Sequence, residues 1–277
     1  MKYSRAYVEI TNICNRSCSF CPGSKREKRR MTEEEFAVVL EKLSNTTEYI
    51  YYHLMGEPTT HPKLCDFIRM ANGKGYKSAV TTNGTLLNKV GDKLIESGVY
   101  KVNISVHSFE EGSAEEHMEY ISHCLDFAEK ASENGVLCVL RLWNNGFEEE
   151  KNGTVLNMLK HKFPEGEWSY GKRGIRLRHK LHLEYGDRFA WPDMAADNIG
   201  DEVFCYGLRD HFGILCDGSV VPCCLDHEGD IVLGNIFTED IEAILNSSRA
   251  ENICRGFDAR HATEELCRRC GYARRFG

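Results

Sequence analysis

Three cysteines near the start of the chain could bind a metal cluster together. Cys14, Cys18 and Cys21 form a C-x3-C-x2-C pattern that directly follows an apolar run over residues 6–10. Cysteine thiolates are the standard ligands of iron–sulfur clusters. A cubane that is held by three cysteines instead of four keeps one iron open to a small molecule. The alternatives for this pattern are a zinc knuckle and three buried thiols.

A second group of cysteines lies toward the end of the chain, where Cys267 and Cys270 form a C-x2-C pair. Twelve residues, a glycine and four more residues separate two earlier members, Cys205 and Cys223. Four thiolates would saturate an iron–sulfur cluster or a structural zinc ion. The ligand set stays open because three more cysteines lie nearby: Cys216, Cys224 and Cys254.

Short polar motifs follow the predicted strands. Gly56-Glu57-Pro58 comes after the second strand, and Asn83 follows the third within Thr-Thr-Asn-Gly. Ser105 ends the fourth strand, and Arg141, a side chain suited to pairing with a carboxylate, lies on the fifth. In parallel α/β folds, ligands bind at the C-terminal ends of the strands. Each motif alone is typical of an ordinary turn, but their order predicts one shared site.

The elements that would position these residues alternate between strands and helices. Strands are predicted over residues 6–11, 48–54, 76–81, 100–106, 136–142 and 174–183. Helices are predicted over residues 32–43, 61–72, 86–97, 114–133 and 149–162, the first with a capping box at its start. Six β-α units in fewer residues than the about 250 of a full barrel predict an α/β fold, a partial (β/α)6 TIM-type barrel.

The alternation stops before the C-terminal cysteines. We therefore expect two domains, a barrel over residues 1–195 and a small second domain over residues 196–277. In the second, apolar runs at 212–216 and 219–223 flank Asp217-Gly218, which is typical of a hairpin with a two-residue turn.

Composition narrows the class of protein. The net charge of −7 disfavours a general nucleic-acid binder, although residues 25–30 hold five basic side chains in six. We interpret this run as a solvated loop, with a phosphate or acidic-substrate site as the alternative. No apolar run approaches the roughly 20 residues of a membrane span, and no export signal is expected. The chain has thirteen cysteines, grouped with spacings that are typical of metal ligands. This grouping favours a protein of the reducing cytoplasm.

The first cysteine pattern and the strand-end motifs resemble the signature of the radical S-adenosylmethionine (radical SAM) enzymes. The resemblance implies a [4Fe-4S] cluster on Cys14, Cys18 and Cys21 whose open iron binds SAM, and which splits SAM to a 5′-deoxyadenosyl radical when reduced. It further implies that SAM is bound by Phe20, Gly56, Glu57, Pro58, Asn83, Ser105 and Arg141. Asn144 or Asn145 is a possible ribose contact, and His107 faces the substrate or is an ordinary loop residue.

The C-terminal cysteines resemble the first half of the SPASM pattern, and more closely its shorter version, the twitch domain. This resemblance implies one auxiliary [4Fe-4S] cluster that is held by Cys205, Cys223, Cys267 and Cys270. Because four cysteines would saturate the cluster, electron transfer is expected instead of substrate binding. A zinc ion on four cysteines is the alternative.

Together the resemblances imply an enzyme that abstracts hydrogen from a substrate C–H and passes an electron through the auxiliary cluster. Twitch relatives oxidise alcohols of aminocyclitols, so small-molecule dehydrogenation is expected, and crosslinking or epimerisation of a ribosomally made peptide is the alternative. RNA modification and a non-catalytic iron–sulfur or zinc scaffold are weaker interpretations. The expected partners are a small molecule or peptide and a reductant such as flavodoxin or ferredoxin, with no membrane.

Overall fold

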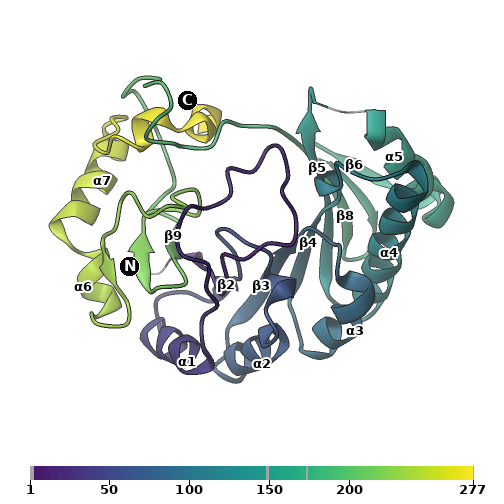
Figure 1. The fold of residues 1–277 in the computed structure, drawn as a ribbon, viewed down its shortest axis with the longest axis horizontal. Helices are drawn as coiled ribbons and strands as arrows, with labels where there is room; N and C mark the ends of the chain where they lie inside the picture. Colours follow the sequence, from purple (N-terminus) through teal and green to yellow (C-terminus); the bar gives the residue numbers. More distant parts are fainter. Residues whose placement is uncertain (1–2, 148–149, 173, 277) are drawn as a thin grey trace.

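One mixed sheet organises the computed structural model, which describes residues 3–147, 150–172 and 174–276. Among these residues the strand order is β11-β10-β9-β1-β2-β3-β4-β5-β8-β7-β6. The neighbours from β9 to β8 pair in parallel, and the outer strands pair antiparallel. The sheet curves without closing, and helices cover its outer face (Figure 1). The prediction of a partial α/β barrel is confirmed.

Repeated strand–helix units build the parallel part of the sheet. Its strands are β1 (Arg5–Val8), β2 (Tyr49–Tyr51), β3 (Lys77–Thr82), β4 (Lys101–Ser105), β5 (Leu137–Asn145) and β8 (Leu181–Asp187). The helices between them are α1 (Glu33–Lys42), α2 (Leu64–Gly73), α3 (Leu87–Glu96), α4 (Ala114–Glu133) and α5 (Glu150–Lys162). The predicted capping box is present, because Thr32 and Glu35 each accept from the other's backbone N–H.

The apolar faces of the helices pack on the outside of the sheet and leave its inside to polar residues. Phe36 on α1 stacks on Phe67 on α2 with ring centroids 4.3 Å apart. Ile50 and Tyr52 are fully buried beneath these helices. Since successive strand residues point to opposite faces, Tyr51 and His53 point into the barrel, where both line a cavity.

The predicted strand over residues 174–183 is wrong as a single element. It is a hairpin in which β7 (Gly174–Arg178) runs antiparallel to β8, and β6 (Ser169–Gly171) pairs with β7. The chain reverses at Lys180, which has a left-handed φ of 57°. A lysine seldom adopts this conformation, so no glycine or asparagine marked the turn in the sequence.

The C-terminal part joins the same sheet. It contains β9 (His211–Ile214), β10 (Ser219–Val221), β11 (Gly234–Asn235), α6 (Ile241–Leu245) and α7 (Ser248–Asp258). The predicted hairpin is present, but Leu215 bonds Ser219 across it, so its turn has three residues instead of two. Because β9 pairs in parallel with β1, the domain boundary after residue 195 stays a prediction.

Helix α7 was not predicted, although its buried residues Ala250, Ile253 and Phe257 have helical spacing. The short 3-10 helices are η1 (Pro58–Thr60), η2 (Val106–Ser108), η3 (Glu165–Glu167), η4 (Cys267–Arg269) and η5 (Gly271–Phe276). A search of the described helices finds none with the length and apolar character that a membrane span requires.

Candidate functional site

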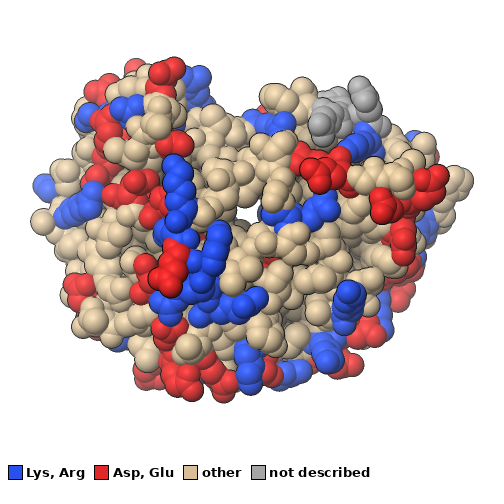
Figure 2. Space-filling model, viewed as in Figure 1, with Lys and Arg blue, Asp and Glu red and all other residues tan. Residues whose placement is uncertain are grey.

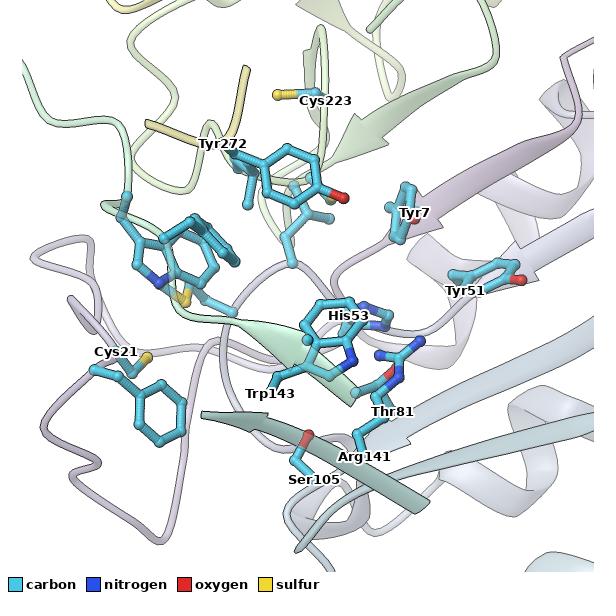
Figure 3. A pocket seen from close by; sticks show the side chains of 18 of the residues that line it. Tyr7, Cys21, Tyr51, His53, Thr81, Ser105, Arg141, Trp143, Cys223 and Tyr272 are labelled. Carbon is cyan, nitrogen blue, oxygen red and sulfur yellow. The ribbon is translucent and has the colours of Figure 1, made fainter. Parts of the chain in front are cut away.

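A large cavity of about 1990 Å³ lies inside the curved sheet. Figure 2 shows that this face of the molecule is hollowed at its centre. Both groups of cysteines line the cavity: Cys14, Cys18, Cys21, Cys205, Cys223, Cys267 and Cys270. Figure 3 shows Cys21 and Cys223 on one side of it and Tyr51 and Arg141 on the other. Two cysteine groups about 200 residues apart in sequence therefore share one cavity.

The first cysteine group lies on the loop that follows β1. The N–H of Arg16 donates to Sγ of Cys14 at 3.4 Å, and Sγ of Cys18 donates to the carbonyl of Ser108 at 3.5 Å. Burial raises the pKa of all three thiols, and burial together with Glu110 raises the pKa of Cys18 to about 11. These thiols stay protonated until a metal cation displaces the protons, as ligation of iron requires.

Two residues that the sequence did not indicate anchor the cysteine loop. The Glu110 carboxylate accepts from both N–H and Oγ of Ser19 at 2.5 Å, and Nη2 of Arg188 donates to the same Oγ at 2.9 Å. Glu110 follows η2 and Arg188 follows β8, so these contacts join distant loops. Only their position beyond strand ends could have indicated them.

The Gly56-Glu57-Pro58 turn packs directly against the cysteine loop. Gly56 has a φ of +77°, and a Cβ there would lie 2.3 Å from the carbonyl oxygen of Thr11. The N–H of Glu57 donates to the carbonyl of Ile13 at 2.9 Å. Glycine is therefore required at position 56 because a side chain would separate the two loops.

The buried carboxylate of Glu57 connects this turn to the next one. It accepts from N–H and Oγ1 of Thr59 at 3.0 and 2.7 Å, and from N–H of Asn83 at 2.7 Å. Burial raises its pKa, and these donors oppose that shift. Glu57 lines the cavity but is only 2% exposed as a whole residue, so little of its surface is accessible. Its predicted contact with SAM stays a prediction.

Asn83 reaches the cysteine loop from the end of β3. Its Nδ2 donates to Oδ1 of Asn15 at 2.9 Å and lies 3.9 Å from Sγ of Cys14. Its Oδ1 accepts from N–H and Oγ1 of Thr85 at 3.0 and 2.7 Å. The predicted residues Gly56, Glu57, Pro58 and Asn83 thus meet around the loop that carries Cys14.

We expect Gly56→Ala to weaken SAM binding at least tenfold in the cluster-loaded protein, because the new Cβ must displace the Thr11 carbonyl. Gly75→Ala is the matched control, since Gly75 has a φ of +86° and no atom within 4 Å of an added Cβ. It should carry only the strain of a left-handed alanine, about 1–2 kcal/mol, and retain SAM affinity. Equilibrium dialysis with SAM measures both variants, and equal affinities would show that the close approach has no functional role.

Ser105 and Arg141 lie level with each other on β4 and β5. The Arg141 guanidinium lies 4.5 Å from the ring centre of Trp143, and its Nε lies 3.4 Å from Oε2 of Glu184 on β8. Burial lowers the pKa of Arg141, and Glu184 opposes this. Both predicted residues line the cavity, and their roles toward SAM stay predictions.

Phe20 and His107 form a contact at the side of the cavity, with ring centroids 5.1 Å apart. Nδ1 of His107 lies 3.0 Å from the carbonyl oxygen of Arg141, and burial lowers the pKa of this histidine. The two candidate asparagines differ. Asn145 lines the cavity and bonds Asp187 at 3.1 Å, whereas the Asn144 amide donates to the Asn152 side chain at 3.1 Å.

The second cysteine group forms around the hairpin and η4. Burial is the main reason that the pKa of Cys223 is raised well above its ordinary value, and repulsion from neighbouring thiolates adds to it. Those neighbours are Cys224, Cys205, Cys270 and Cys267. The N–H of Gly207 donates to Sγ of Cys205 at 3.4 Å. The four predicted ligands therefore lie together.

The three other nearby cysteines have different surroundings. Cys216 is buried beside Glu9, and Sγ of Cys254 lies 3.6 Å from the carbonyl of Leu208. Cys224 bonds the Tyr7 hydroxyl, and burial raises its pKa to about 11. This arrangement favours Cys223 over Cys224 as a ligand, which remains a prediction.

The donor atoms fit clusters better than single metal ions. Across the described residues, no three His, Cys, Asp or Glu side chains converge as ligands of one metal ion would. A tetrahedral zinc site would need such convergence. In a cubane cluster each thiolate binds a different iron, so the thiolates need not converge on one ion.

The basic run at residues 25–30 is a loop in which two of the five basic side chains are paired with carboxylates. Nη2 of Arg26 binds both oxygens of Glu9 at 2.7 and 2.8 Å, and its Nε donates to the carbonyl of His227 at 2.8 Å. Arg29 pairs with Glu35 at 2.5 Å. The exposed side chains of the run, Lys25, Lys28 and Arg30, fit the expected solvated loop, whereas Arg26 joins the cysteine loop to the C-terminal part, which was not expected.

Comparisons of the sequence with known proteins identify the two parts. The family model described as the radical SAM superfamily matches residues 8–148, and an iron–sulfur cluster-binding domain, SPASM, matches residues 205–271. A tungsten-containing aldehyde ferredoxin oxidoreductase cofactor-modifying protein of Pyrococcus furiosus is 35% identical over 111 residues, 38% of this chain and 31% of the relative. A probable GTP 3′,8-cyclase of Sulfurisphaera tokodaii is 35% identical over 109 residues, which are 37% of this chain and 34% of the relative. The matches thus span about a third of these relatives.

Solved structures resemble the fold over most of the chain. BtrN in complex with AdoMet and 2-DOIA has a TM-score of 0.66 at 20% identity and covers 98% of this chain and 94% of its own. The structure called anSMEcpe with AdoMet and the Cp18Cys peptide has a TM-score of 0.61 at 15% identity, and the match covers 96% of this chain and 88% of the anSMEcpe chain. SuiB of Streptococcus suis bound to S-adenosylmethionine has a TM-score of 0.59 at 13% identity, and the match covers 98% of this chain and 70% of the SuiB chain.

These findings confirm the resemblance that the cysteine spacing indicated. The first family model covers more than half of the chain, and it contains Cys14, Cys18 and Cys21 with the strand-end motifs. The radical SAM domain implies a [4Fe-4S] cluster with SAM, and the SPASM domain implies auxiliary iron–sulfur binding. The chain therefore belongs to the radical SAM superfamily and carries a SPASM domain in its C-terminal part.

Proposed function

We propose that this protein is an oxidoreductase that removes hydrogen from a C–H position of a small molecule, with one auxiliary [4Fe-4S] cluster that carries the electron away. The observation that carries the proposal is that both cysteine groups line one cavity. The chemistry that the first cluster and SAM supply when bound is reductive cleavage of SAM to a hydrogen-abstracting 5′-deoxyadenosyl radical.

The chain's own residues hold the loop that carries the first cysteine group in place. Asn83, Glu57 and Asn15 interlock three loops around Cys14, so the cluster ligands are fixed before substrate arrives. Glu110 and Arg188 fix the other end of the cysteine loop. A hydrogen-abstracting radical requires such a site, because a substrate that is misplaced by an ångström loses much of the rate.

The small-molecule substrate is supported by the extent of one structural match. BtrN, solved with AdoMet and 2-DOIA, covers nearly all of this chain and of its own. SuiB covers 98% of this chain but only 70% of its own length, so SuiB contains more structure than the shared fold.

A peptide substrate is the second candidate because of two exposed aromatic residues at the rim of the cavity. Tyr170 is 69% exposed and Tyr206 is 47% exposed, and both line the opening. Exposed aromatic side chains are common in surfaces that bind peptides. Structures of anSMEcpe and SuiB with peptides add to this alternative. RNA modification stays the weaker alternative, because two of the five basic side chains of the run, Arg26 and Arg29, are paired with carboxylates.

We further propose that the protein works in a reducing cytoplasm and receives its electrons from a small reductant such as flavodoxin or ferredoxin. All thirteen cysteines are free thiols, which supports a reducing compartment. The reductant follows from the proposed chemistry, since each cleavage of SAM consumes one electron.

Anaerobic reconstitution tests the proposal. The wild type should bind about eight irons and form 5′-deoxyadenosine with dithionite, as two [4Fe-4S] clusters require. Cys267→Ala with Cys270→Ala should lose about four irons, retain uncoupled SAM cleavage and lose substrate oxidation. Iron and sulfide analysis and chromatography of 5′-deoxyadenosine measure these outcomes. Zinc without iron, or a wild type that forms no 5′-deoxyadenosine, would refute the proposal.

A further inference from the structure

The inner end of the cavity, away from the first cysteine group, has a floor of which the cluster and SAM assignments explain only Arg141. We define this floor by six cavity-lining residues, Arg5, Tyr7, His53, Lys101, Arg141 and Glu184. Tyr7 contacts the rings of Tyr51 and His53 with centroids 5.2 and 5.3 Å apart. Figure 3 shows Tyr7, Tyr51, His53 and Arg141 together on the side away from Cys21.

The floor carries more positive than negative charge. Arg5 is neutralised by Asp210, which lies at the start of β9. Arg141 pairs with Glu184 at 3.4 Å. Lys101 has no such partner, because no carboxylate of the described chain lies within ion-pair distance of its Nζ. Its pKa is lowered by burial and by the nearby Arg141 and Arg5, with Glu184 opposing.

The titratable neighbours do not supply the missing negative charge. Burial, together with Arg141, lowers the pKa of His53 to about 3, and burial lowers that of His211 on β9 to about 4. Tyr7 also stays neutral, since burial raises its pKa. The floor therefore holds one basic side chain, Lys101, that has no carboxylate partner among the described residues, and aromatic side chains surround it.

Three polar atoms, two at the floor and one on Trp143 beside Arg141, are buried and have no hydrogen-bond partner. They are Nδ1 of His53, Nε1 of Trp143 and Nε of Arg141, the last of which forms an ion pair with Glu184 that does not reach hydrogen-bond geometry. Arginine and tryptophan nitrogens can only donate, and the histidine nitrogen can donate in one tautomer. A buried donor without a partner costs roughly 1–3 kcal/mol, so these atoms are suited to an acceptor that arrives with a ligand.

We propose that the floor binds an anionic group of the substrate, a carboxylate or a phosphate, with Lys101 supplying the charge and the buried donors of Trp143 and His53 supplying hydrogen bonds. The inference rests on the proposed function, because it places one end of the substrate at the floor while the reacting C–H of the same substrate lies near the cysteines. It selects an anionic substrate and disfavours an amine, which the same cations repel.

The test uses the holoenzyme with both clusters and saturating SAM. Inorganic phosphate and acetate are titrated separately against chloride at equal ionic strength, and the rise in the thermal transition gives an apparent Kd. We expect saturable binding of one of the two, which identifies phosphate or carboxylate as the group. Lys101→Met should raise that Kd at least tenfold, and Lys101→Arg should restore it. Arg176→Met is the control, because Arg176 is exposed on β7, outside the cavity.

Three outcomes would overturn the inference: neither anion stabilises the wild type more than chloride, Lys101→Met binds as tightly as wild type, or phosphate competes with SAM. The last would assign the floor to the carboxylate of SAM. The same wild-type samples are assayed for 5′-deoxyadenosine. Formation of 5′-deoxyadenosine without anion binding removes this inference alone, whereas its absence removes the proposed function.

Discussion

Replacing Cys14, Cys18 and Cys21 together by alanine is expected to abolish the formation of 5′-deoxyadenosine while about four irons remain bound at the C-terminal cysteines. All three side chains line the cavity from one loop after β1. No other cysteine follows β1 on this loop, so within the described residues the chain offers no substitute ligands there. The expected loss is complete, because SAM cleavage requires the iron that these thiolates hold.

The measurement pairs iron analysis with a dithionite assay for 5′-deoxyadenosine. Cys65→Ala is the control, since Cys65 lies on α2 and belongs to neither cysteine group. It should keep about eight irons and full activity. Residual cleavage in the triple variant would contradict the assignment of this loop. Loss of all iron would mean that the two cysteine groups fold as one unit.

Arg26→Met is expected to destabilise the protein strongly, because it leaves the Glu9 carboxylate buried without a counter-charge. Glu9 is 0% exposed, and the Arg26 side chain is 14% exposed. Breaking such a pair costs about 3–5 kcal/mol. In a chain of this size the thermal transition should fall on the order of 10 °C. The carboxylate also accepts from N–H of Met55 and of Cys216, so both cavity walls should loosen.

Arg29→Met is the matched control for this experiment. Arg29 pairs with Glu35, but the two side chains are 33% and 26% exposed, so the pair contributes no more than about 1 kcal/mol. Replacing Glu9 and Arg26 together with apolar residues should recover much of the stability, since no unpaired charge remains. Anaerobic differential scanning calorimetry compares the variants. Equal effects of Arg26→Met and Arg29→Met would exclude a special role for the buried pair.

The sequence predicted well the features that depend on local patterns. The alternation of strands and helices, the capping box at Thr32 and the hairpin at Gly218 are all present. These succeed because spacing, capping and turn residues act within a few positions of the chain. The cavity-lining positions of Cys14, Gly56 and Asn83 followed from one rule, that parallel strands end at the same edge.

The features that were missed depend on contacts between distant residues. Arg26 contacts the carbonyl of His227, 201 positions away, and nothing in a basic run indicates such a partner. Lys180 takes a left-handed conformation that its residue type does not suggest. The floor of the cavity collects residues from β1, β4, β5 and β8 and from the segment after β2, and no local pattern connects them.

The pairing of β9 with β1 has a consequence for how the chain is made. Ser4 and Asp210 are 206 positions apart, yet they bond each other at the start of this pair. One edge of β1 therefore stays open until the ribosome has added those residues, on the order of 10–40 s at typical synthesis rates. An unpaired strand edge invites association with other chains. Release of the nascent chain before residue 211 should thus yield an aggregation-prone fragment. Synthesis of β9 then covers the open edge of β1.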